Sequence, residues 1–394
     1  NAGVAQPGFF RDKYDCSANG SVASSIALAM PMVSSPAAGQ VGFSAVGATN
    51  AYYGAFAAAR TRGAKFHPET VQQADAITRI SEAHAQASTA TTYCAWWSAG
   101  STNYPKGCDN NALGSTDDGT LTFTSAGAAS YPNMAKTGSG SNFAKTTHNG
   151  QACGIADVAG NIYKINPGMT GIGTTKAITA ATKTNPVQIT VTGHGRITGD
   201  VAVIDGVVGM TQINTKAFTV TVVDANNLTL DGVDGTGFGT YTSGGTLYNA
   251  TFYALKPTAD ITAITDGATL STDHWGAAGV AANFDPITLN FRTDYPNNAI
   301  GQRYGNGSNA VFSNATAADR ARTMLGMPAA GGVSPSGSSL MGTDYYYEHM
   351  VNQICMVSRG HWYNGNAAGG RVRDLNGARS DAYATVGFAA CRYL

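Results

Sequence analysis

The sequence predicts an α+β fold, in which a main domain with two helices is interrupted by a small all-β module. Residues 49–63 and 67–88 have the alanine content and the apolar spacing of helices. Residues 173–248 instead consist of short β-branched runs separated by Gly and Asn turns, which is typical of strands. Because the composition of residues 1–172 returns at 249–394, we interpret these two ranges as one domain around an insertion at 173–248.

Each predicted helix has recognisable ends. The first opens at Thr49 or Asn50, which are residue types that cap helix N-termini, and it stops at Gly63. The second has Pro68 at its first helical position. The apolar residues of the second helix recur every three or four positions and form one face for packing: Val71, Ala74, Ile77, Ile80 and Ala83 or His84.

Charged residues are scarce, at 12% of the chain, whereas Gly contributes 49 residues. The surface must therefore be built largely from Asn, Thr, Ser, Gly and Tyr, a composition that is common in secreted and virion surface proteins. The 24 basic and 24 acidic side chains cancel, so we expect neither nucleic acid nor an anionic membrane as a partner. No run of 18 apolar residues occurs, which argues against membrane insertion.

The chain lacks the nucleophile elbow, the phosphate loop, the HExxH zinc motif and the dinucleotide fingerprint. We therefore expect neither an enzyme nor a catalytic cofactor. One oxygen-rich turn, at Asp157 and Asn161, is a candidate for binding a structural Ca²⁺. The interpretation that we favour is that these two side chains satisfy the backbone of a tight turn.

Six cysteines occur, and none belongs to a CxxC pair. An even count suits disulfides, and the pairs to test first are Cys94 with Cys108 and Cys355 with Cys391. Buried free thiols are the alternative, because connectivity cannot be read from spacing.

The segment 359–380, "RGHWYNGNAAGGRVRDLNGARS", combines aromatic, amide and charged side chains with small residues. Such side chains are favoured by adaptable binding surfaces, since Tyr supplies contact area at low entropic cost and Asn supplies hydrogen bonds. We predict a ligand-binding face made of His361, Tyr363, Asn364, Asn366, Arg371, Arg373, Asp374, Asp381 and Tyr383.

Two motifs resemble C-type-lectin-like domains of the formylglycine-generating-enzyme type. They are "GIADVAGNIYKI" at 154–165 and the closing segment 357–394. The resemblance implies two helices, twisted antiparallel strands and long loops. It also implies a structural framework in the closing segment, made of Arg359, Trp362, Arg379, Ser380 and Phe388. The copper-binding cysteine pair and the iron-binding histidines of the enzymes in this superfamily have no counterpart here beyond Cys391, so catalysis is not expected.

The inserted segment is similar to a small β-barrel module of ubiquitin-activating enzymes, which is a structural and docking module. Together the two parts resemble phage tropism determinants and other targets of diversity-generating retroelements. This resemblance implies a virion surface or tail-fibre protein, made in the host cytoplasm, that attaches to a host receptor or glycan. It also implies contacts with other virion proteins and a homo-oligomer, with a trimer expected. The alternative is a capsid decoration or collar protein whose lectin-like face packs on other virion subunits.

Overall fold

Strands dominate the computed structural model, which describes residues 1–87, 122–124, 133–139, 153–158, 160–264, 283–287, 302–303, 322–327, 345–348, 353–364 and 368–394. Over these residues, strands account for 35% and helices for 13%. The predicted α+β fold of the C-type-lectin-like type with two helices is therefore wrong, because the chain is mostly β-sheet distributed over several sheets. The physical reason lies in the abundant Thr, Val and Gly, which favour extended backbone and tight turns over helix.

The main body is built around a six-stranded sheet in the order β18-β19-β21-β20-β9-β22. Its strands are β18 (Gln302–Arg303), β19 (Tyr345–Glu348), β21 (Arg373–Leu375), β20 (Met356–Ser358), β9 (Tyr163–Asn166) and β22 (Val386–Gly387). β9 pairs antiparallel with β20, with Ile165 opposite Val357, and parallel with β22. The motif at 154–165 and the closing segment therefore meet in one sheet.

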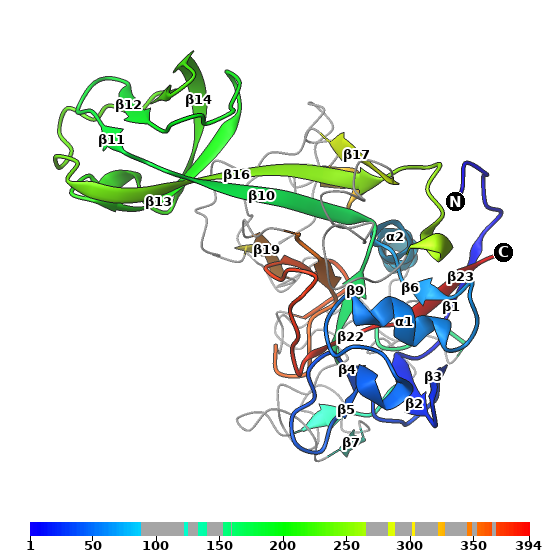
Figure 1. Cartoon of the computed structure of the whole chain (residues 1–394). Helices are drawn as coiled ribbons and strands as arrows, with labels where there is room; N and C mark the ends of the chain where they lie inside the picture. The colour runs from blue at the N-terminus through cyan, green and yellow to red at the C-terminus, as the bar shows by residue number, and fades with distance from the viewer. Residues whose placement is uncertain are drawn as a thin grey trace.

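Smaller sheets surround this body. A three-stranded sheet combines β1 (Phe9–Arg11), β23 (Ala390–Tyr393) and β6 (His67–Pro68). The two-stranded sheets pair β2 (Cys16–Asn19) with β3 (Val22–Ser25), β4 (Met32–Val33) with β5 (Val41–Gly42), and β7 (Phe123–Thr124) with β8 (Met134–Ala135). The first and last strands of the chain are neighbours in the three-stranded sheet, so the two termini lie on the same side of the molecule (Figure 1).

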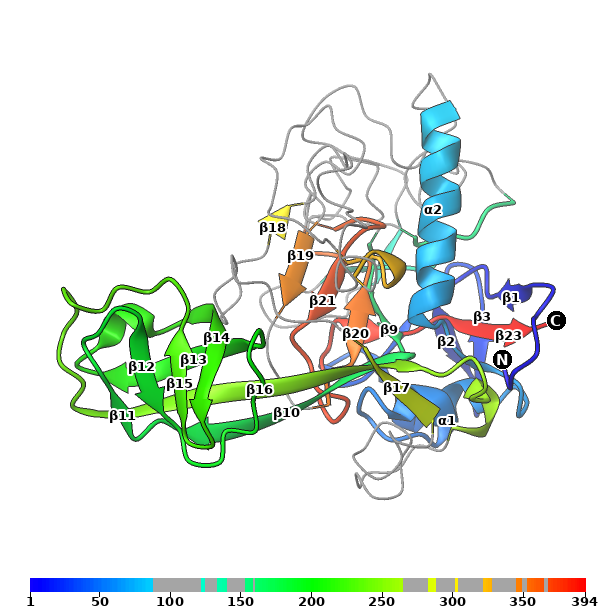
Figure 2. The ribbon, with the colours of Figure 1, turned by 90° about the horizontal axis from the view of Figure 1, so that it is seen from above.

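A long two-stranded ribbon joins the main body to a β-module that projects to one side (Figures 1 and 2). The ribbon consists of β10 (Met169–Ala177) and β16 (Ser243–Leu255), paired from Met169↔Ala254 to Ala177↔Thr246. β16 continues into an eight-stranded sheet with β13 (Val201–Val208), β14 (Lys216–Asp224), β15 (Asn227–Leu230), β12 (Val187–Thr190), β11 (Ala180–Ala181) and, on the body side, β17 (Phe284–Ile287). The chain therefore enters and leaves the module at adjacent positions.

Both predicted helices form, but their beginnings differ from the prediction. α1 covers Gly54–Arg60 and has no side-chain cap, because Thr49 and Asn50 lie before its first turn. α2 covers Val71–Ala87, while Pro68 belongs to β6. A capping box opens α2: Gln73 N donates to Thr70 Oγ1 at 3.2 Å, and Thr70 N donates to Gln73 Oε1 at 2.9 Å. Among the described residues, 3-10 turns are formed by η1 (Phe43–Val46), η3 (Thr211–Ile213) and η4 (Ile261–Ala263).

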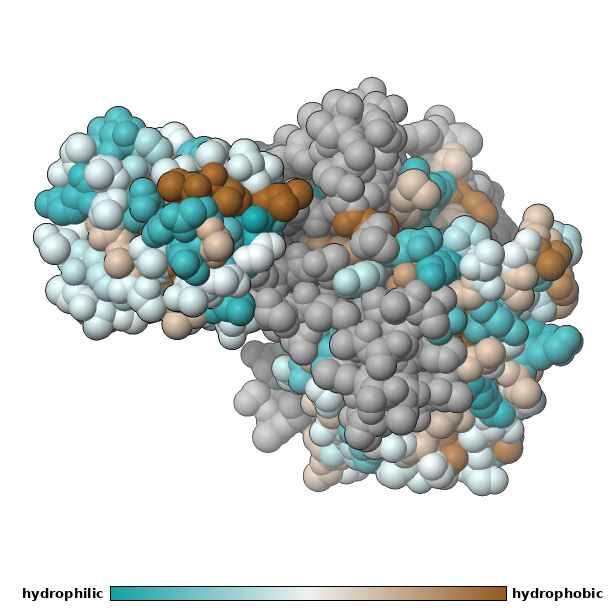
Figure 3. Space-filling view, turned by 45° about the horizontal axis from the view of Figure 1, so that its top comes forward, coloured by the Kyte–Doolittle hydropathy of each residue, from teal (hydrophilic) through white to brown (hydrophobic). Residues whose placement is uncertain are grey.

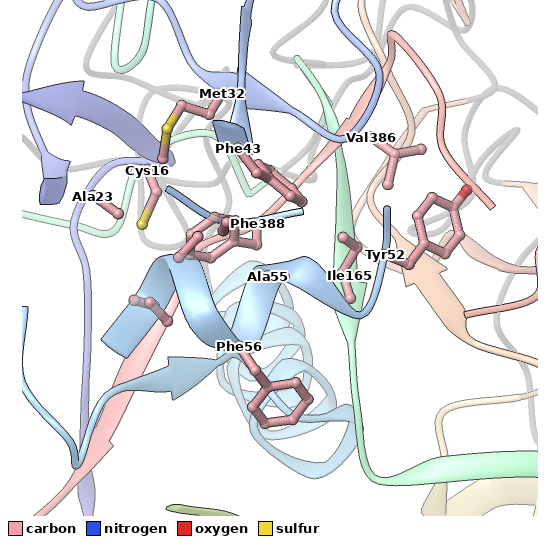
Figure 4. Close-up of a cluster of buried hydrophobic side chains, with 14 of the residues drawn as sticks. Cys16, Ala23, Met32, Phe43, Tyr52, Ala55, Phe56, Ile165, Val386 and Phe388 are labelled. Atoms are coloured by element: carbon pink, nitrogen blue, oxygen red, sulfur yellow. The ribbon is translucent and has the colours of Figure 1, made fainter. Parts of the chain in front are cut away.

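The body and the module each have an apolar core. In the body, Phe43 and Phe388 meet edge to face at 5.3 Å, among Cys16, Met32, Phe56 and Ile165 (Figure 4). The module encloses a separate cluster of aliphatic residues that includes Ile189, Ile204 and Leu228. A further cluster combines Val203 and Ala217 of the module with residues of the body, so the two parts share buried apolar surface.

Polar side chains cover much of the surface in Figure 3, with a hydrophobic strip on the module. The module exposes three large aliphatic side chains, Ile197, Val208 and Val223. Among the helices that the structure describes, none combines the length and the apolar character needed to cross a bilayer.

Candidate functional site

Four of the residues predicted to bind ligand converge on one pocket of about 210 Å³ in the main body. They are His361, Tyr363, Asp374 and Tyr383. The remaining wall consists of Tyr52, Tyr163, Val357, Asn376, Gly377, Thr385 and Val386. The pocket therefore draws on the residues before α1, on three neighbouring strands of the six-stranded sheet (β9, β20 and β21), and on the loop that leads into β22.

Aromatic rings form most of the wall. The rings of Tyr163 and His361 meet edge to face at 5.0 Å, and the His361 ring lies 3.8 Å from that of Tyr363. The Tyr52 and Tyr383 rings lie 6.2 Å apart and belong to the same wall. Tyr383 is 49% exposed, which makes it the most accessible ring of this set. The pocket thus offers several π-faces, one of them at the surface.

Asp374 places a carboxylate in this aromatic surrounding. Its Oδ1 accepts a hydrogen bond from Asn376 N at 2.9 Å, and the carboxylate accepts another from the Tyr163 hydroxyl. Burial raises the pKa of Asp374 to about 6, although both hydrogen bonds act to lower it. The group is therefore mostly ionised at neutral pH.

The neighbouring titratable groups of the pocket are uncharged at neutral pH. Burial lowers the pKa of His361 to about 3, so its imidazole is neutral. Burial also raises the pKa of Tyr52, and the nearby Asp374 raises it further. The pKa of Tyr383 is raised by burial and by Asp381. Both phenols therefore stay protonated.

A tight turn after β20 presents His361 and Tyr363. Arg359 and Gly360 have positive φ values of 82° and 83°. A Cβ at Gly360 would lie 2.7 Å from the Cβ of Ala368, so the close approach requires glycine. Asn364 Oδ1 accepts from His361 N at 2.8 Å and closes the turn.

Trp362 lies in the same turn but does not line the pocket. It is fully buried in a cluster with Val33, Met134 and Ile162, and its ring meets that of Tyr363 edge to face at 5.5 Å. Trp362 therefore supports the pocket wall from the protein interior.

Arg371 and Arg373 were predicted to face the ligand, but both are buried on the other side of the sheet. Arg371 pairs with Asp75 of α2 at 3.1 Å, and Arg373 Nη1 donates to Gly370 O at 3.0 Å. Since side chains alternate along a strand, Arg373 points towards α2 while Asp374 points into the pocket. These two arginines are thus part of the support and are absent from the exposed face.

The framework residue Arg359 connects α2 to the sheet. Its guanidinium donates to Thr78 Oγ1 at 2.6 Å, to Gly370 O at 2.9 Å and to Ala74 O at 3.0 Å. It also lies 3.9 Å from the Glu69 carboxylate. Burial lowers the pKa of Arg359 to about 9, so the group keeps its charge at neutral pH.

Further buried charges extend this network to the N-terminal strands. Arg11 pairs with Glu69 at 3.1 Å, and Lys164 of β9 pairs with Asp15 at 3.0 Å. Burial acts to raise the pKa of Glu69, but Arg11 and Arg359 hold it below the ordinary value. The network joins β1, β9, α2 and the closing segment beneath the pocket.

The other framework residues take up different positions. Arg379 is buried, and its Nε donates to Gln353 Oε1 at 2.5 Å. Phe388 packs in the main core, whereas Ser380 is exposed. Asp381 lies outside the lining and accepts from Ala378 N at 2.9 Å, while Asn366 falls outside the described residues.

The predicted disulfide between Cys355 and Cys391 is not formed, because both are buried free thiols. Burial raises the pKa of each thiol well above the ordinary value, which makes it unreactive. Cys94 and Cys108 lie outside the described residues.

Asp157 and Asn161 both adopt positive φ, at 56° and 70°, as the predicted turn requires. Asp157 Oδ2 accepts from Gly138 N at 2.8 Å, a backbone group outside the turn, and among the described residues the Asn161 amide finds no hydrogen-bond partner, so these bonds do not show the turn-satisfying role that we favoured. In the part of the chain that the structure describes, no three His, Cys, Asp or Glu side chains gather as metal ligands. Since Ca²⁺ takes six to eight oxygen ligands, these two residues do not provide a site for it by themselves.

Sequence reasoning missed Tyr52, Tyr163, Asn376 and Thr385. Tyr163 could have been found, because it lies in the "GIADVAGNIYKI" motif that the sequence analysis singled out. Tyr52 precedes α1 and carried no signal, since the fold alone brings it to the closing segment. A second cavity of about 450 Å³ between the ribbon and the start of α2 contains none of the predicted residues.

The comparison with protein families concerns the module. Residues 182–250 match the family model of the ubiquitin-activating enzyme E1 FCCH domain. This match confirms the resemblance of the inserted segment to a module of those enzymes, and it covers a minor part of the chain. No curated protein matches the chain.

Proposed function

We propose that this chain is a surface protein of a bacteriophage virion and that it attaches to the host by binding a receptor or glycan through the aromatic pocket. The observation that carries the proposal is the convergence of His361, Tyr363, Asp374 and Tyr383 on that pocket. Asp374 comes from the interior strand β21 and the other three come from loops, and binding residues concentrate on loops that a rigid scaffold positions.

The support beneath the pocket favours recognition over a passive surface. The buried network of Arg359, Glu69 and Arg11 holds α2 against the sheet, so the aromatic groups are fixed before a ligand arrives. Fixed anchors lose less entropy on binding, which improves affinity for a given contact area. The resemblance of the closing segment to targets of diversity-generating retroelements supports the phage context.

The module supplies a second contact surface in this proposal. Its exposed aliphatic side chains, Ile197, Val208 and Val223, are suited to contact with other virion proteins, including further copies of this chain. Repetition of a weak site on one particle would raise the overall avidity.

Cell binding tests the proposal. Fluorescently labelled protein is incubated with a panel of bacterial strains, and bound fluorescence is measured by flow cytometry. Tyr383→Ala removes the exposed ring, and we expect at least about a tenfold loss of binding, as is typical of an aromatic hot spot. Phe10→Ala, which removes an exposed ring on β1 outside the pocket, is the matched control.

Two results would contradict the proposal. Equal binding by Tyr383→Ala and the unaltered protein would exclude the pocket as the contact site. A protein that binds no strain, yet enters virus particles tightly, would indicate the capsid decoration role instead.

A further inference from the structure

The charge of the pocket points to one class of ligand. Among the described residues that line it, Asp374 is the sole ionised side chain at neutral pH, and no Lys or Arg contributes. The nearest arginine in the sequence, Arg373, directs its guanidinium to Gly370 O and Val372 O and is fully buried. The site therefore has a negative potential without a cation of its own.

The aromatic groups add to this potential. The face of a phenol or imidazole ring carries the negative end of a quadrupole, which attracts a cation within about 6 Å of the ring centre. Tyr52, Tyr163, Tyr363 and Tyr383 all contribute to the wall, together with the neutral His361. A carboxylate flanked by several rings is the arrangement that holds ammonium groups in aromatic cages.

Asp374 keeps acceptor capacity for such a ligand. A carboxylate has about four lone-pair positions, and the hydrogen bonds from Asn376 N and Tyr163 occupy two of them. The pocket therefore has unused acceptor capacity on Asp374, next to aromatic faces.

Size restricts the ligand further. At about 210 Å³ the pocket is smaller than the 300–1,000 Å³ that is typical of sites for whole drug-sized molecules. It can enclose one compact group at the end of a larger ligand, while the remainder lies over the exposed Tyr383 ring.

We propose that the pocket binds an ammonium group on the host-surface ligand, held between the tyrosine rings and the Asp374 carboxylate. This inference rests on the proposed attachment function for its biological ligand, but the chemistry of the pocket can be tested separately. The ammonium could belong to a choline substituent, an amino sugar or a lysine side chain, which share the cation and differ in the group that carries it.

Nuclear magnetic resonance titration of protein with ¹³C-labelled tyrosine rings tests the inference. Choline is compared with 3,3-dimethylbutan-1-ol, which has the same shape and no charge. Glucosamine and Nα-acetyl-lysine, in further titrations, distinguish the sources of the ammonium group. We expect at least one of the three cations to bind with a Kd at least about tenfold below that of the neutral alcohol, as a desolvated cation–π site would give.

Two variants locate the effect. Asp374→Asn keeps the shape and the acceptor for Asn376 N but removes the charge, and we expect about a tenfold rise in the Kd of the cation with no change for the neutral alcohol. Asp285→Asn removes an exposed carboxylate outside the pocket and should leave the Kd unchanged.

The inference is overturned if none of the three cations binds, if the alcohol binds as tightly as choline, or if Asp374→Asn leaves the cation affinity intact. If the protein fails these titrations but still binds cells, the ammonium inference is wrong and the attachment function is supported. If the protein binds a cation but attaches to no strain, the ammonium inference is supported and the attachment function is contradicted.

Discussion

Replacing Arg359 by methionine tests whether the buried ion network holds the pocket together. The substitution keeps an unbranched side chain of similar length and removes the guanidinium. It deletes the three hydrogen bonds to Thr78, Gly370 and Ala74, at 2.6 to 3.0 Å. It also leaves Glu69 with one less positive neighbour.

The expected magnitude follows from two opposing effects. Hydrogen bonds that involve a charged group contribute about 1.5–3 kcal/mol each, so three of them give roughly 4.5–9 kcal/mol before any correction. Burying the guanidinium costs several kcal/mol of hydration, which methionine does not lose. Since Glu69 remains buried with an incomplete set of partners, we expect a net loss of about 3–5 kcal/mol in the free energy of unfolding.

Urea denaturation followed by circular dichroism measures this loss. Arg359→Lys is the intermediate variant, because lysine keeps the charge but cannot make the same forked set of hydrogen bonds. Arg392→Met replaces an exposed arginine on β23 and should change the stability by less than about 0.5 kcal/mol. A loss below about 1 kcal/mol for Arg359→Met, or equal losses for the two methionine variants, would refute the reasoning.

Three further outcomes are expected. Burial lowers the pKa of His67 from 6.5 to about 4, so between these values the unfolded chain binds a proton that the folded protein does not. In urea melts at each pH, the free energy of unfolding of the unaltered protein should therefore fall by about 3 kcal/mol relative to His67→Asn between pH 7 and pH 4. Parallel curves of stability against pH for the two proteins would contradict this. Thr70→Ala breaks the capping box of α2 and should lower the stability by about 1 kcal/mol in the same assay, whereas Thr236→Ala on an exposed turn of the module serves as its comparison. Choline binding should weaken about tenfold from pH 7.5 to pH 5, because Asp374, with a pKa of about 6, takes up a proton in this range. The groups that face it are Tyr52, Tyr163, His361, Tyr363 and Tyr383, with Asp381 nearby; the pKa of His361 is lowered to about 3, and those of Tyr52 and Tyr383 are raised. A pH-independent Kd would exclude this carboxylate as the partner.

The sequence was informative wherever a local pattern controls the structure. The apolar spacing in residues 67–88 located α2, and the buried Val71, Ala74 and Ile77 lie on the predicted face. Ile80 is exposed instead, because the buried face of the helix continues through Thr78 and Ser81, which are both fully buried. The β-branched runs of the module were legible for the same reason, since alternating burial along short strands depends on near neighbours.

The overall class was misjudged because two helical patterns were given too much weight. α1 is only seven residues long, and over the described residues strands account for 35% against 13% for helices. Strand pairing depends on partners that are distant in sequence, such as Val386 beside Tyr163. Local patterns do not report such partners.

The residue types of the closing segment by themselves indicated a binding surface there, since aromatic, amide and acidic side chains are gathered in a short stretch of sequence. The tertiary structure alone decided which of them line the pocket. Arg373 and Asp374 are adjacent and equally polar, yet one is buried against Asp75 of α2 and the other lines the pocket. The physical reason is the alternation of side chains along β21 combined with a helix, nearly 300 residues earlier in the chain, that supplies the buried countercharge.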